Sequence, residues 1–251
     1  MNVSLLGFQS MLGRAVRASG DPAVSHRCNV PADVPTDLTT LFASPGFRIT
    51  VDVQRSWSMG RAAKSARLTL SILPPEQSRQ ILEQWVKAGG GTASFFATEA
   101  DAFLDFIAEH LPAPSHLLTI CRLEQATLRA SEAARRFIAP PLSGLDLPGR
   151  VLRASRQASL VRFYAEPNLV LAALDGGAFP AMSSSIVSLL FAPGLDRLLR
   201  EATGEQIALW ERLIEPVEMK TLLYEGHRRE VIAALTLAGA TEYVEQGQRC
   251  V

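Results

Sequence analysis

The sequence carries no excess charge of either sign. Its 251 residues include 25 lysines and arginines and 25 aspartates and glutamates, so the formal net charge at pH 7 is +0. Proteins that bind nucleic acid without sequence preference rely on clustered positive charge, which displaces counterions from the phosphates. The composition therefore argues against general nucleic-acid binding.

Long apolar segments are also missing. A helix that crosses a bilayer needs about 20 consecutive apolar residues, and no run approaches that length although hydrophobic residues make up 47% of the chain. The N-terminal stretch MNVSLLGFQSMLGRAVRASG has no acidic residue, as in transit peptides. It lacks the apolar core and small-residue cleavage site of a secretory signal. We expect a protein with no membrane contact, in which residues 3–18 form an amphipathic helix.

Cysteine is rare. The three cysteines, Cys28, Cys121 and Cys250, are far apart and odd in number, and no CxxC pair occurs. Disulfide frameworks and zinc sites usually show paired, closer spacings. We expect reduced thiols, a cytoplasmic location and no metal site in this chain.

Helical periodicity dominates the first 137 residues, where apolar side chains recur at spacings of three and four. Pro74 and Pro75 open one helix, and the glycines at 89–91 close it. We interpret the Ser-Pro-Gly stretch at 44–46 as the end of a short helix. The other helices are expected at 3–18, 50–72, 98–112 and 115–137.

A stretch rich in proline and glycine, APPLSGLDLPG at 139–149, precedes a change of pattern to alternating apolar residues. We predict an α+β, mostly helical fold. An all-α N-terminal domain at 1–140 and a linker at 141–149 are followed by a smaller domain at 150–251, with a short antiparallel sheet and helices. Strands are expected at 150–155, 158–166 and 185–193, and further helices at 195–203, 205–214 and 229–245.

The helix at 115–137 carries three chemically active side chains, His116, Cys121 and Glu124. At 100° per residue, Cys121 lies on the apolar face and His116 about 140° away from it, so the two do not converge as metal ligands would. Glu124 falls in the centre of the apolar stripe, where a carboxylate needs a cationic partner. We expect a structural ion pair of Glu124 with Arg55, Arg61 or Arg67.

Motifs of autonomous catalysis are missing: the chain has no HExxH, no GxSxG and no P-loop. We therefore expect no catalytic residues. A small sheet in a helical chain has exposed edges, which can pair with an added peptide strand unless a neighbouring helix covers them. The candidate peptide-binding residues are Ser159, Leu160, Val161, Arg162, Phe163 and Tyr164.

Several stretches resemble one known family. In the first half they are RSWSMGRAAKSARLTLSILP, EQWVKAGGGTASFFATEADAFLDFIAEHLP and SHLLTICRLEQATLRA. In the second half they are SLVRFYAEPNLVLAAL and SLLFAPGLDRLL. Together they are similar to the MbnC family of methanobactin biosynthesis. More distantly, the RLEQA helix resembles a family described as DNA-binding and encoded beside multinuclear iron oxidases.

The MbnC resemblance implies a non-catalytic subunit. Members of that family form a heterodimer with MbnB, a TIM-barrel non-haem iron oxidase, and the pair binds the leader of the precursor peptide MbnA. Using molecular oxygen, the pair converts cysteines of the precursor to oxazolone and thioamide groups, which later chelate copper. The resemblance places the iron and the catalysis in the MbnB-like partner, so it implies no cofactor in this chain.

Two alternatives to this interpretation stay open. One is a DNA-binding regulatory protein, because the segment around Gly226 has the pattern of a C-terminal helix-turn-helix; the acidic composition of that segment favours a packing motif instead. The other is an enzyme that uses His116, Cys121 and Glu124.

Overall fold

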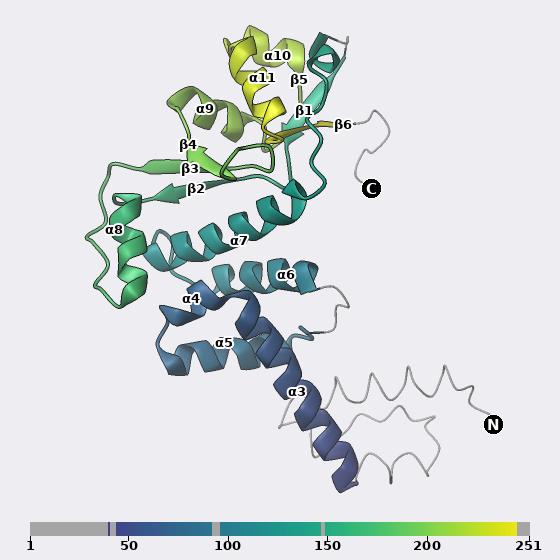
Figure 1. The fold of residues 1–251 in the computed structure, drawn as a ribbon, viewed down its shortest axis with the longest axis vertical. Coiled ribbons are helices and arrows are strands. Elements are labelled where there is room, and N and C mark those ends of the chain that lie inside the picture. The colour runs from purple at the N-terminus through teal and green to yellow at the C-terminus, as the bar shows by residue number, and fades with distance from the viewer. Residues whose placement is uncertain (1–39, 41–43, 92–95, 147–148, 245–251) are drawn as a thin grey trace, which may run out of the picture. The chain divides into compact units, whose positions relative to one another are not determined.

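The computed structural model describes residues 40, 44–91, 96–146 and 149–244. A mostly helical N-terminal region is followed by a region with two small antiparallel three-stranded sheets and helices (Figure 1), which confirms the predicted α+β class. The helix predicted at 3–18 lies outside the described residues, as do Cys28 and Cys250.

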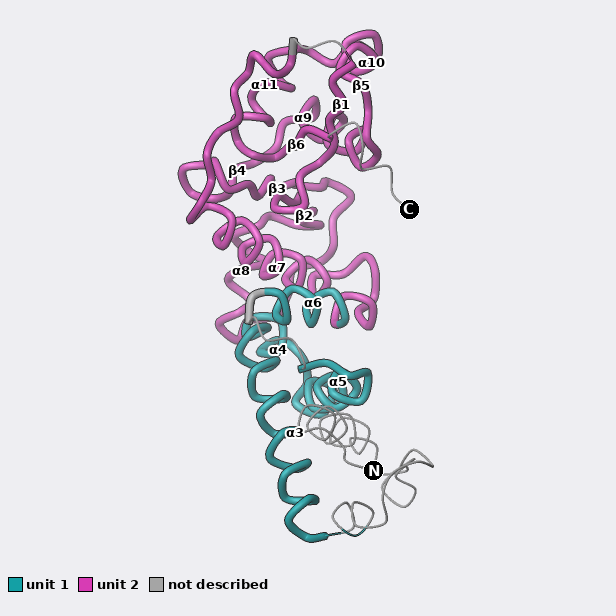
Figure 2. Tube along the Cα trace, turned by 90° about the vertical axis from the view of Figure 1, so that its right-hand side faces the viewer, with its two compact units in different colours: residues 1–106 teal, residues 107–251 magenta. Residues whose placement is uncertain are grey.

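Two compact units make up the chain, residues 1–106 and residues 107–251 (Figure 2). The division falls inside the helix α6 (Phe96–Glu109). The linker predicted at 141–149 lies within the second unit, between its first helix and its first strand.

The first helix of the first unit with described bounds is the long α3 (Pro45–Ser65). Ser44 caps this helix, because its hydroxyl accepts a hydrogen bond from the Phe47 N–H at 3.2 Å, and Pro45 takes the first helical position. The next helix, predicted from residue 50, therefore starts at Pro45, and the short helix predicted before Ser-Pro-Gly lies mostly outside the described residues. The following helices are α4 (Arg67–Ser71), α5 (Pro75–Lys87) and α6.

The glycines at 89–91 end α5 as predicted, and Gly90 also makes room for Trp85. Gly89 has a φ of 87°, in the left-handed region that glycine enters without strain. A Cβ atom at Gly90 would lie 2.1 Å from the Trp85 ring. Trp85 packs on Phe103 and Phe106 of α6, with ring centroids 5.3 and 5.4 Å away. The glycine turn at the end of α5 thus leaves the space in which the Trp85 ring packs on α6.

The second unit contains two sheets whose strands are all antiparallel. One sheet has the order β5-β1-β6 and the other the order β2-β3-β4. The strands are β1 (Val151–Ala154), β2 (Ser159–Phe163), β3 (Val187–Phe191), β4 (Leu199–Glu201), β5 (Val217–Glu218) and β6 (Thr241–Val244).

All three predicted strands are present, but two others replace predicted helix. The segment at 195–203 ends in β4 rather than forming a helix, and Leu198 just before that strand has a φ of 62°. The helix predicted at 229–245 stops at Leu237, because Gly239 turns the chain with a φ of 71° into β6. β6 pairs with β1, which lies far away in the sequence, whereas β4 pairs with the preceding strand β3 across a short turn. Neither pairing shows in the periodicity of the segment itself.

Helices of the second unit cover the sheets and share one apolar core with them. Leu152 of β1 and Leu190 of β3 are at most 1% exposed and belong to the same buried cluster as Leu209, Leu222 and Ile232 of the later helices. The helical elements are α7 (His116–Ala134), η1 (Leu142–Asp146), α8 (Pro167–Ala172), η2 (Ala173–Asp175), α9 (Gly204–Arg212), α10 (Met219–Tyr224) and α11 (Arg229–Leu237).

Phe137, just after α7, is held in a slot between two glycines. A Cβ atom at Gly194 would lie 2.4 Å from its ring, and a Cβ atom at Gly239 would lie equally close. The aromatic ring therefore takes the space that any larger residue would fill, and it fixes the end of α7 on the turns after β3 and α11.

Candidate functional site

β2 is an edge strand of the sheet β2-β3-β4. Its neighbour on one side is β3, and no strand in the described part of the chain pairs with its other side. In an antiparallel ladder, successive residues turn their main-chain groups alternately toward and away from a neighbour. Ser188 of β3 lies opposite Arg162, and its carbonyl accepts from Ala202 on the far side at 2.8 Å. Arg162, and by the same alternation Leu160, therefore turn their N–H and C=O groups outward.

This outer edge is covered at two carbonyls. The hydroxyl of Thr119 on α7 donates to the Arg162 carbonyl at 3.0 Å. Beyond the strand, the Tyr164 carbonyl accepts from the Ser183 N–H at 2.5 Å. The N–H and C=O of Leu160 and the N–H of Arg162 also point outward from the strand, away from β3. The helix thus closes part of the edge and leaves a part of it accessible.

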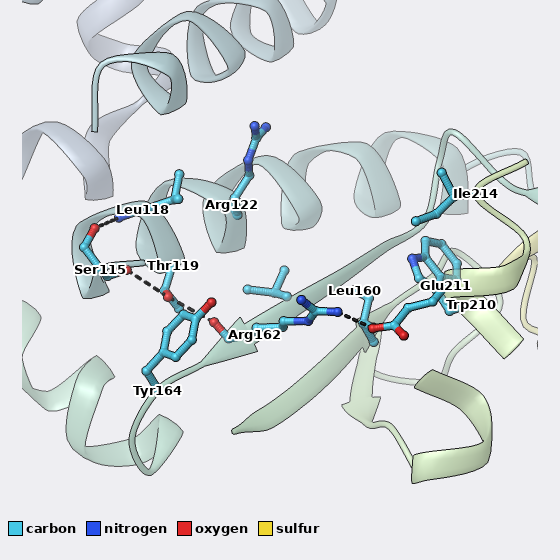
Figure 3. Close-up of a pocket in the computed structure, with 11 residues that line it drawn as sticks. Ser115, Leu118, Thr119, Arg122, Leu160, Arg162, Tyr164, Trp210, Glu211 and Ile214 are labelled. Carbon is cyan, nitrogen blue, oxygen red and sulfur yellow. Dashed lines mark hydrogen bonds and ion pairs between the residues drawn. The ribbon is translucent and has the colours of Figure 1, made fainter. Parts of the chain in front are cut away.

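A pocket of about 290 Å³ lies along this part (Figure 3). The first half of α7 forms one wall, β2 forms the base, and the end of α9 with the following residues forms the opposite wall. Its apolar lining consists of Leu118, Leu160, Val161, Trp210 and Ile214. Ile214 is 71% exposed, so the pocket has an apolar rim that meets solvent.

Both arginines at the pocket have side-chain partners. Arg162 extends along the pocket to Glu211 of α9, with which it forms an ion pair (Figure 3). Arg122 donates to Gln125 at 2.6 Å, and its guanidinium points away from β2. The space beside Leu160 is therefore bounded by apolar side chains and main-chain polar groups.

The structure brings the predicted edge residues together in one strand. Ser159 to Phe163 form β2, and Tyr164 follows directly. Val161 and Phe163 have their side chains buried, at 2% and 0% exposure. Leu160, Val161, Arg162 and Tyr164 line the pocket. The binding of a peptide by these residues stays a prediction.

Sequence reasoning missed the residues of the two walls. Thr119 lies in the same helix as His116, Cys121 and Glu124, and nothing local marks its hydroxyl as a partner of a strand 43 residues away. Trp210 and Ile214 fit the amphipathic pattern of a core helix. Only the structure shows that Trp210 is half-buried and that Ile214 is exposed, a combination that often lines binding surfaces.

The three chemically active side chains of α7 differ in their surroundings. Cys121 is 0% exposed, as its place on the apolar face predicted, and Glu124 is half-buried. His116 is only 7% exposed, although it was expected away from the apolar face. Its ring stacks on Phe179 with centroids 5.5 Å apart, and its Nε2 lies 2.9 Å from the Pro180 carbonyl. The loop before β3 therefore covers the first turn of α7.

A buried carboxylate bound by an α3 arginine does occur in the first unit. Arg61 forms an ion pair with Glu99 of α6, whose side chain is 3% exposed. Arg55 pairs with Glu83 at 3.8 Å, and Arg67 is exposed. The pairing of Glu124 with one of these arginines stays a prediction.

The helix pair α10 and α11 has Gly226 at its turn, with a φ of 87°. Leu222 of α10 and Ile232 and Leu235 of α11 are 0% exposed and belong to the core of the second unit. One face of each helix is thus engaged in packing.

Among the described residues, no three His, Cys, Asp or Glu side chains are grouped so that they could hold a metal ion. None of the described helices has the length and apolar character needed to cross a membrane. No protein-family model matches the chain, and no curated protein matches it significantly.

Proposed function

We propose that this chain is the non-catalytic partner subunit of a peptide-modifying iron oxidase and that it binds the leader of the precursor peptide by strand addition to β2. The observation that carries the proposal is the outward main chain of Leu160 and Arg162 beside the pocket. An added strand gains affinity from main-chain hydrogen bonds and specificity from the walls that its alternate side chains meet.

The two walls of the pocket suit an extended peptide. Directly opposed residues of an antiparallel pair point to the same face of a sheet. A peptide residue opposite Leu160 would therefore point to the face on which Leu160 packs with Trp210 against the core. The next residue would lie opposite Val161 and point to the other face. Apolar side chains at such positions would bury the exposed rim at Ile214.

The motif resemblance supports the assignment of the partner. In this proposal an MbnB-like oxidase holds the iron and performs the oxidation with molecular oxygen, in a cytoplasmic heterodimer with this chain. The products are the oxazolone and thioamide groups of a copper-chelating peptide. This chain supplies leader recognition and holds no cofactor of its own.

Co-expression with an MbnB-like oxidase tests the assembly. We expect a stable 1:1 complex on size exclusion, and binding of a fluorescein-labelled synthetic leader of an MbnA-like precursor by fluorescence polarisation. Failure of the two proteins to associate at micromolar concentration would contradict the proposal. A DNA-binding regulator would instead show binding to duplex DNA that weakens steeply with salt, which a gel-shift titration measures.

A further inference from the structure

The Thr119 hydroxyl has one proton and two acceptors within reach. Its oxygen lies 3.1 Å from the carbonyl of Ser115, one turn earlier in α7, and 3.0 Å from the carbonyl of Arg162 on β2. A hydroxyl donates one hydrogen bond at a time. Thr119 is only 3% exposed, so water has little access to its hydroxyl. The hydroxyl proton therefore goes to one of these two carbonyls.

The carbonyl that Thr119 caps is one that an added strand needs. Arg162 turns its N–H and C=O to the outer edge, so a peptide paired at this residue would donate its own N–H to that carbonyl. This holds for an antiparallel and for a parallel peptide, since both orientations use the outward carbonyl. A carbonyl oxygen has two lone pairs, but the Thr119 oxygen lies 3.0 Å away on the outer side from which a peptide N–H would approach, so the two compete for that approach.

We infer that Thr119 is a positioning residue that holds the Arg162 carbonyl in the unbound chain and turns to the Ser115 carbonyl when a peptide strand pairs with β2. The inference rests on the proposed leader binding. The exchange leaves no donor unpaired in either state, because the Ser115 carbonyl is already within hydrogen-bond distance. It also explains how an exposed sheet edge is protected when no peptide is bound.

Replacement of the hydroxyl by a methyl group tests this exchange. Thr119→Val keeps the volume and removes the internal donor, so the Arg162 carbonyl of the unbound variant lacks its partner. We expect the labelled leader to bind about 2- to 10-fold more tightly than to the wild type, as the loss of one competing hydrogen bond implies. Thr119→Ser keeps the hydroxyl and should bind like the wild type. Thermal unfolding verifies that both variants are folded.

A second measurement separates this role from a purely structural one. Methylation of single peptide nitrogens, one at a time, identifies the leader residue whose N–H pairs at Arg162. The gain from Thr119→Val should disappear for the leader methylated at that nitrogen, which a double-mutant cycle measures. Equal or weaker binding by a folded Thr119→Val protein, or a gain that persists with every methylated leader, would overturn the inference. Failure of the wild type to bind the leader would instead overturn the proposed function.

Discussion

Arg162 of β2 and Glu211 of α9 form an ion pair beside the pocket, with each side chain 48% exposed. Because both groups are half in solvent, the pair contributes little to stability, about 0–1 kcal/mol. We expect Glu211→Gln to change the free energy of unfolding by less than about 1 kcal/mol in urea titrations. The matched control is Glu205→Gln, which loses a comparable exposed pair with Arg228. A variant that unfolds would show that Glu211 supports the pocket wall in another way.

The ion pair of Arg61 with Glu99 should behave differently, because Glu99 is 3% exposed. Loss of the cation leaves a buried carboxylate without its charged partner, which typically costs about 3–5 kcal/mol. We expect Arg61→Met to destabilise the protein within or near that range. Arg55→Met is the control, since its pair with Glu83 at 3.8 Å is more exposed and should cost less than about 1 kcal/mol. Equal unfolding midpoints in chemical denaturation would contradict the assignment.

The slot around Phe137 predicts a large effect of one methyl group. In Gly194→Ala the new Cβ would lie 2.4 Å from the Phe137 ring and 2.8 Å from the Leu237 carbonyl, so the turn or the ring must move. Overpacking of this kind typically costs about 1–3 kcal/mol. Gly60→Ala in α3 meets no atom within 4 Å and should stabilise its helix by up to about 1 kcal/mol. Opposite shifts of the melting temperature are the expected result.

Burial of Cys121 predicts slow reaction of its thiol. In a Cys28→Ser, Cys250→Ser background, Cys121 is the only cysteine, and at 0% exposure it should react with a thiol reagent only when the second unit opens. We expect alkylation at neutral pH to accelerate strongly in denaturant. Fast, stoichiometric labelling of the folded protein would revive the interpretation of Cys121 as a nucleophile.

Local signals explain which parts of the fold were predictable. Pro75 and Gly89 bound α5 in the sequence as in the structure, and Ser115 precedes α7 as a cap whose hydroxyl accepts from the Leu118 N–H at 3.1 Å. Ser44 carries the same kind of signal, since its hydroxyl accepts from the Phe47 N–H at 3.2 Å, and it places the start of α3 at Pro45 rather than at the predicted residue 50. Capping residues and apolar periodicity were thus sufficient to predict most of the helices.

Pairing between strands explains what was missed. β4 and β6 are three and four residues long and exist through hydrogen bonds with β3 and β1. The edge position of β2 follows from β1 joining the other sheet, which no local pattern reveals. The role of Thr119 depends on a strand that is 43 positions away in the sequence. The candidate strand was therefore predictable, and the walls of its pocket were not.

Strand addition at β2 is the central claim, and a proline at Arg162 tests it most directly. Arg162→Pro removes an outward N–H without breaking the ladder to β3, whereas Arg162→Ala removes the same side chain and keeps the N–H. Fluorescence polarisation with the labelled leader measures the affinity of both variants, and circular dichroism verifies their folds. We predict that the alanine variant binds the leader within about 3-fold of the wild type and that the proline variant binds at least about 10-fold more weakly. Equal affinity of the two folded variants would contradict peptide binding at this edge.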